Sequence, residues 1–169
     1  MTKKERVLQA FQNRPVDKVP MGFWYHFSPD EDTGEVMVKQ HLDLYREADT
    51  DFIKVMCDGY FNYPNPYIQK VTCAEDWFGL TPLGDDHPYI TNQVNRVKAI
   101  VDAVNDECCV FYNVFCPMSL MRFGTSEELL MKHLRENPEA VCHAFTVIAK
   151  DIKALVRSLI TEAGSTGIY

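Results

Sequence analysis

The chain has 169 residues, of which 46% are hydrophobic and 24% are charged, a composition typical of one globular domain. Its formal net charge of -7 and its lack of a basic run argue against a nucleic-acid-binding surface. No stretch approaches the roughly 18 apolar residues of a membrane-spanning helix and no export signal is present, so we expect a cytoplasmic protein that binds no membrane. The six cysteines have neither a CxxC pair nor a metal-ligand spacing, and we expect reduced, buried thiols.

The first third of the chain predicts two helices and two strands. Thr2 and Glu5 have the spacing of a capping box, which marks the start of a first helix. The aromatic-rich stretch at residues 20–27 predicts the first strand. A second helix is expected over residues 35–48, and the short apolar run at 52–57 predicts a second strand that is buried on both faces, as in parallel sheets.

A long irregular stretch follows the second strand. Residues 57–90 show no clear periodicity, and a loop of this length is usually functional or a sign of a wrong assignment. Its many aromatic residues argue against disorder. Beyond it, residues 94–104 have the apolar spacing of a helix, and the β-branched and aromatic run at 109–115 predicts the third strand.

The last third predicts turns, two helices and the beginning of a fourth strand. Turns are expected at Pro117 and at Thr125, a short helix around residues 129–134, and a long amphipathic helix over 141–160. The stretch 167–169 then opens a fourth strand. Alternating strands and helices indicate an α/β fold with a parallel sheet and right-handed crossovers, in the spatial order of the chain. No glycine-rich phosphate-binding motif follows any strand.

Four stretches, taken in order, resemble the uroporphyrinogen decarboxylase family. They are the opening TKKERVLQAFQNRPVDKVPMGFW, the strand DFIKVMCDGY that ends in an aspartate, the FCPMSLMRFG stretch after the third strand, and EAGSTGIY before the fourth. The resemblance implies a (β/α)8 barrel with its active site at the C-terminal mouth of the strands. Residues 1–169 would then be the N-terminal half of such a domain, a partial TIM barrel of about four parallel strands with flanking helices.

Half a barrel has consequences for its partners. Its first and last strands would be open edges, and its inner face would lack a partner surface. We therefore expect either a C-terminal half that is missing from these 169 residues or a homodimer in which two copies rebuild a ring of eight strands.

Asp58 is the candidate catalytic residue. It follows an apolar strand and precedes Gly59, so we expect it at the barrel mouth. The resemblance places it where the family holds the pyrrole nitrogens of its substrate, and there an ionised carboxylate would stabilise the cation formed during decarboxylation. From the residues alone, an Asp-Gly turn that ends the strand explains the same pair.

Four other residues are candidate substrate contacts: His26, Tyr60, Arg122 and Phe123. His26 ends the first predicted strand, where it could serve as a metal ligand, a proton shuttle, a substrate donor or a simple hydrogen-bonded histidine. Tyr60 belongs to the aromatic stretch, which would wall an apolar pocket or only cover the barrel mouth. Phe123 stands where the family has a tyrosine and cannot donate a hydrogen bond, a loss that Arg122 beside it could offset in part.

Three functions remain open. One is a carboxy-lyase that acts on a small molecule, although the family's carboxylate-gripping arginines are replaced here by WYHFSPDEDTG, with no arginine and three acidic residues. A second is a corrinoid-linked, zinc-dependent methyltransferase, whose His and Cys ligands the resemblance puts in the second half of the barrel. The third is a non-catalytic half-barrel that self-assembles. We expect no metal and no cofactor in this part of the chain, and no decarboxylase activity from it alone.

Overall fold

The computed structural model describes all of residues 1–169. They divide into two units. The first unit comprises Met1–Gly59, Asn92–Val114 and Val156–Tyr169, and the second comprises Tyr60–Thr91 and Phe115–Leu155. No helix is long and apolar enough to cross a membrane.

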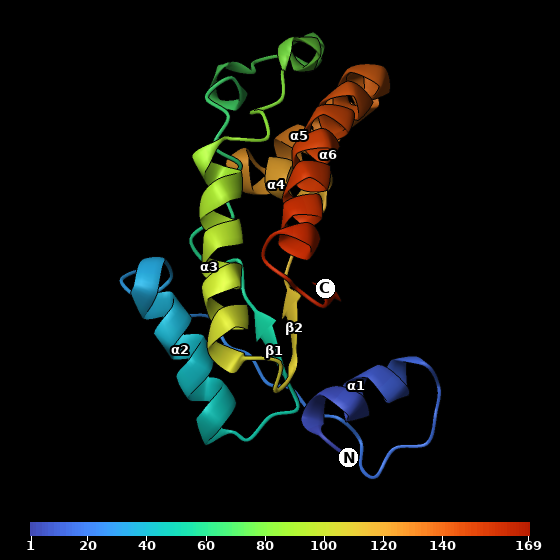
Figure 1. Cartoon of the computed structure of the whole chain (residues 1–169). Helices are drawn as coiled ribbons and strands as arrows, with labels where there is room; N and C mark the ends of the chain where they lie inside the picture. Colours follow the sequence, from blue (N-terminus) through green and yellow to red (C-terminus); the bar gives the residue numbers. More distant parts are fainter. The chain divides into compact units, whose positions relative to one another are not determined.

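The first unit contains a parallel sheet of three strands. The strands are β1 (Phe52–Val55), β2 (Cys109–Tyr112) and β3 (Gly167–Ile168), and they lie in the order β1-β2-β3. All neighbours pair in parallel, with Phe52 opposite Cys109 in the register of β1 and β2, which lie side by side in Figure 1. Three of the predicted strands, their direction and their order are therefore confirmed.

The predicted strand at residues 20–27 is wrong, because this segment is extended but not part of the sheet. At one end, Asp51 N–H donates to Met21 O (2.7 Å) and the Asp51 carboxylate accepts from Met21 N–H (2.9 Å). At the other end, Phe27 N–H donates to the Asp58 carboxylate (3.0 Å). One backbone hydrogen bond and two aspartate side chains thus hold the segment, without the backbone ladder that would define a fourth strand.

Phe52 explains why the segment leaves the plane of the sheet. A Cβ atom added to Gly22 would lie 2.4 Å from the Phe52 ring, so the backbone passes directly over that ring. The following side chains are exposed rather than buried, although their aromatic character suggested a core strand: Phe23, Trp24 and Tyr25.

Three helices pack in the first unit as the sequence predicts. α1 (Lys3–Phe11) begins with the capping box, in which Thr2 Oγ1 accepts from Glu5 N–H (3.1 Å) and Glu5 accepts from Thr2 N–H (2.9 Å). α2 (Gly34–Glu47) contacts β1. α3 (Pro88–Val104) begins six residues earlier than its apolar spacing indicates, and residues 92–104 of it belong to this unit.

The second unit is built from helices and short 3-10 turns. Its elements are η1 (Ile68–Lys70), η2 (Ala74–Gly79), α4 (Pro117–Gly124), α5 (Glu127–Glu136) and the first part of α6 (Pro138–Thr161), which spans the long predicted helix. They share an apolar core whose largest fully buried members are Trp77, Leu80, Met121, Leu130 and Ile148.

The irregular stretch at residues 57–90 is ordered by polar side chains rather than by apolar periodicity. Asp151 of α6 accepts from Tyr63 OH and from Leu83 N–H (2.9 Å). The Asp76 carboxylate accepts from Thr72 N–H (2.7 Å), which starts the turn into η2. Because these acceptors lie outside the stretch or within single turns, no repeating pattern in the sequence reveals them.

The turn predicted at Pro117 is wrong, whereas Thr125 does lie in a bend, between α4 and α5. Pro117 begins α4 instead, in the first helical position, where its missing N–H is not needed. Leu120 and Met121 are buried. Proline marks turns and helix starts alike, so its presence did not separate the two.

Candidate functional site

The site is built where the chain leaves β1. Asp58 follows the strand and is almost fully buried. Gly59 then turns the chain with a φ of +79°, and a Cβ atom there would lie 2.4 Å from the Thr33 methyl group. Only glycine meets both conditions, so the Asp-Gly pair does form a turn, and that turn fixes the carboxylate of Asp58 in place.

His26 and Asp58 form a hydrogen-bonded pair. Their Nδ1 and Oδ1 atoms are 2.8 Å apart, and the second carboxylate oxygen accepts from Phe27 N–H. The Asp58 side chain is only 3% exposed, whereas the His26 side chain is 57% exposed. An ionised Asp58 can only accept, so it holds the proton on Nδ1 and makes Nε2 the basic nitrogen of the neutral ring.

Arg96 of α3 fixes the backbone just after the end of β1. Its guanidinium donates to Asp58 O (3.0 Å) and to Met56 O (2.7 Å), and also to the Tyr112 hydroxyl (2.7 Å). Tyr112 in turn donates to Gln93 Oε1 (2.5 Å). Arg96 is buried, and this network ties α3 and β2 to the residue that carries the carboxylate.

The sequence reasoning missed Arg96 and Gln93. They lie three residues apart in a helix whose neighbouring positions Val94 and Val97 are apolar and buried. Two long polar side chains on the buried side of a helix are uncommon unless they have partners, and that is the signal that could have found them.

Three further polar side chains lie near the strand ends, and all are neutral: His41, Asn113 and Cys57. His41 of α2 accepts from Met56 N–H at Nε2 (3.0 Å) while its Nδ1 contacts Met37 O (2.9 Å), and burial lowers the pKa of His41 to about 4. Asn113 donates to Cys57 Sγ (3.2 Å), and burial raises the pKa of the Cys57 thiol. These groups support the site's backbone and are not candidates for proton transfer near neutral pH.

The other predicted site residues belong to the second unit. Tyr60 O accepts from the Tyr89 hydroxyl (3.1 Å), and Arg122 forms an ion pair with Glu127 (3.5 Å). The Phe123 ring packs against other phenylalanines, with ring centroids 5.1 Å from Phe115 and 6.0 Å from Phe61. The structure therefore brings Asp58 and His26 together, and the substrate contacts of Tyr60, Arg122 and Phe123 stay predictions.

The chain does not assemble a zinc site of its own. No group of three or more His, Cys, Asp or Glu side chains gathers in a way that could hold a metal ion. These residues do not provide the ligands of a zinc ion, and we derive no step through one.

A known structure shares this fold. A methyltransferase from Methanosarcina mazei superposes on the chain with a TM-score of 0.68 and 14% sequence identity, covering 99% of this chain and 58% of that protein. No family model matches the sequence, and no curated protein matches it. At this identity the likeness establishes the fold alone: a mixed helix and sheet structure that corresponds to just over half of a methyltransferase.

Proposed function

We propose that this chain forms part of a methyltransferase of the corrinoid-linked branch of the uroporphyrinogen decarboxylase-like barrels, and that His26 transfers a proton to or from its substrate. The observation that carries the proposal is the 2.8 Å contact between an exposed histidine and a buried carboxylate at the end of β1. In parallel α/β folds of this kind, active sites gather at the carboxyl ends of the strands.

A methyl group is transferred without a proton, so a proton must be added to the group that it leaves or removed from the group that accepts it. When a methyl group leaves an oxygen, nitrogen or sulfur atom, the remaining group takes up a proton. When the group is added to a hydroxyl, amine or thiol, that acceptor loses one. His26 Nε2 supplies or removes this proton, while Asp58 holds Nδ1–H and orients the ring. Such general acid–base catalysis contributes roughly 100- to 10,000-fold in rate.

Two observations favour methyl transfer over decarboxylation. The fold likeness is to a methyltransferase. The stretch at residues 24–34, which contains His26, carries no arginine. It therefore lacks the guanidinium groups that would bind the carboxylates of a polycarboxylate substrate. The neighbouring acidic residues would instead repel such a substrate, and we do not pursue the decarboxylase interpretation.

The test follows the methyl group directly. The purified chain is mixed with methylcobalamin and a panel of thiols, amines and phenols, and loss of the methylcobalamin absorbance reports transfer. We expect His26→Gln to lower the rate at least 100-fold, because glutamine cannot exchange a proton. We expect Asp58→Asn to lower it to a smaller extent and to change the pH profile.

The control is His143→Gln, which removes a half-buried histidine of α6 that belongs to the second unit, and it should leave the rate unchanged. An undiminished rate in His26→Gln would contradict the proposal. Long-range ¹H–¹⁵N spectra of the imidazole provide a second measurement that needs no substrate. They should show the proton of neutral His26 on Nδ1, and they should show a mixed population in Asp58→Asn.

A further inference from the structure

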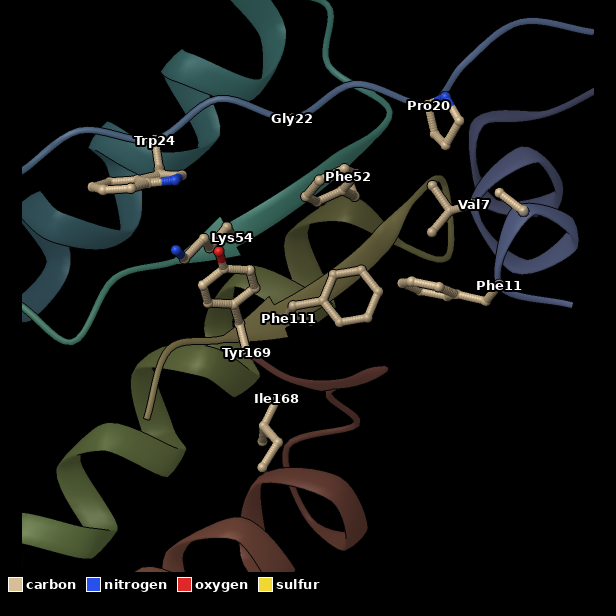
Figure 2. A pocket seen from close by; sticks show the side chains of 11 residues that line it. Val7, Phe11, Pro20, Gly22, Trp24, Phe52, Lys54, Phe111, Ile168 and Tyr169 are labelled. Carbon is tan, nitrogen blue, oxygen red and sulfur yellow. The ribbon is translucent and has the colours of Figure 1, made fainter. Parts of the chain in front are cut away.

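An apolar cavity of about 550 Å³ lies against the sheet of the first unit. It is lined by side chains of α1, the extended segment and all three strands (Figure 2). Five aromatic side chains line it: Phe11, Trp24, Phe52, Phe111 and Tyr169. A cavity of this volume lies within the range that accepts small organic molecules.

One charged side chain points into this cavity. Lys54 of β1 is 6% exposed, and its Nζ atom lies 4.2 Å from the centroid of the Trp24 ring and 3.5 Å from that of Tyr169. Figure 2 shows the amine between the two rings. No carboxylate of the chain lies within 4.0 Å of it, unlike the ammonium groups of Lys3, Lys39 and Lys98.

The environment of Lys54 is costly for a charge. Burial lowers the pKa of Lys54, because the faces of two aromatic rings only partly replace the water that an ammonium group loses. An anion placed beside Nζ would restore the missing charge pair and form a charge-assisted hydrogen bond. The surrounding rings would contact whatever apolar group that anion carries.

We propose that this cavity binds a small carboxylate with an apolar or aromatic body, the carboxylate paired with Lys54 and the body against the aromatic side chains. The site requires neither His26 nor Asp58, so the outcome of its test is distinct from the outcome of the proton-transfer test. Trp24 can report on both sites, because its ring packs edge-on against the His26 ring with centroids 5.5 Å apart.

The experiment compares 4-phenylbutyrate with 4-phenylbutanol, which have the same body and differ in the anionic group. Binding is followed in ¹H–¹⁵N spectra through the two tryptophan indole signals, and affinities come from titration. We expect the acid to shift the Trp24 signal and to leave the fully buried Trp77 unchanged. The acid should bind at least tenfold more tightly than the alcohol.

A matched pair of variants assigns the charge. Lys54→Met keeps the length of the side chain and removes the ammonium, so it should weaken the acid at least tenfold while the alcohol still binds. Lys98→Met removes an exposed charge on α3 and should change neither affinity. Retained binding of the alcohol shows that the cavity persists in Lys54→Met, and the acid–alcohol comparison in the unmodified chain needs no variant.

Three results would overturn the inference: no binding of the acid, equal affinity for acid and alcohol, or an acid affinity that Lys54→Met leaves unchanged. A fourth result that would overturn it is occupation of the cavity by a second copy of the chain. If a second copy of the chain covers this face, sedimentation will show a dimer, and neither compound will shift the Trp24 signal.

Discussion

Replacement of Asp58 by alanine tests the geometry on which the candidate site depends. The carboxylate accepts from two groups, Phe27 N–H at 3.0 Å and the His26 ring at 2.8 Å. His26 is exposed and can turn to water, whereas Phe27 is buried and its amide cannot. A hydrogen bond to a charged acceptor contributes about 1.5–3 kcal/mol, and this is the loss we expect at the Phe27 end of the extended segment.

Native-state hydrogen exchange measures that loss at a single amide. A decrease of about 1.5–3 kcal/mol lowers the protection of Phe27 N–H roughly 10- to 150-fold. Asp58→Asn keeps an acceptor oxygen for this amide, so its effect should be smaller. Asp30→Asn removes an exposed carboxylate from the same segment and serves as the control.

Unchanged protection of Phe27 in Asp58→Ala would refute the reasoning. It would mean that the carboxylate does not hold the segment that carries His26. The proposed proton transfer would then lose its geometric basis as well.

Three further outcomes are expected. First, burial lowers the pKa of His41 to about 4, below the value of roughly 6.5 in the unfolded chain. Below pH 6.5 the unfolded state therefore binds more protons than the folded state. As the pH decreases from 6.5 to 4, the free energy of unfolding should fall by at most about 1.4 kcal/mol per pH unit. Urea unfolding of His41→Gln should lack this part of the pH dependence. Second, Tyr63→Phe removes a buried donor to the Asp151 carboxylate and should lower the free energy of unfolding by about 1.5–3 kcal/mol. Tyr67→Phe, which removes a donor to a neutral carbonyl, should cost about half as much in the same denaturant titration, and equal losses would contradict this account. Third, the chain should produce no coproporphyrinogen from uroporphyrinogen, and detection of that product by chromatography would restore the decarboxylase interpretation.

A local signal in the sequence predicted the start of α1, because its chemistry lies within a few residues: the Thr2–Glu5 capping box is present. The strand predicted at residues 20–27 was wrong, because aromatic content does not distinguish a hydrogen-bonded strand from an extended segment that aspartates hold at both ends.

The candidate site was predictable only in part, because some of its residues have local signals in the sequence and others do not. Asp58 was found because it directly follows an apolar strand, and His26 because it was expected at a strand end, which proved to be an extended segment instead. Arg96 was missed because its partners are backbone carbonyls about 40 residues earlier in the chain, and a carbonyl leaves no trace in the side-chain sequence.

The register of the sheet sets how this protein can fold. Phe52 pairs with Cys109 and Phe111 with Gly167, so each strand pair closes a loop of roughly 56 or 57 residues. Closing one such loop costs about 3.5 kcal/mol of chain entropy on the logarithmic scaling, before any contact within the sheet compensates for it. β3 has only two residues to repay this cost. The helices, whose contacts are local, can therefore form early, and alignment of the strands is expected to limit the rate of refolding.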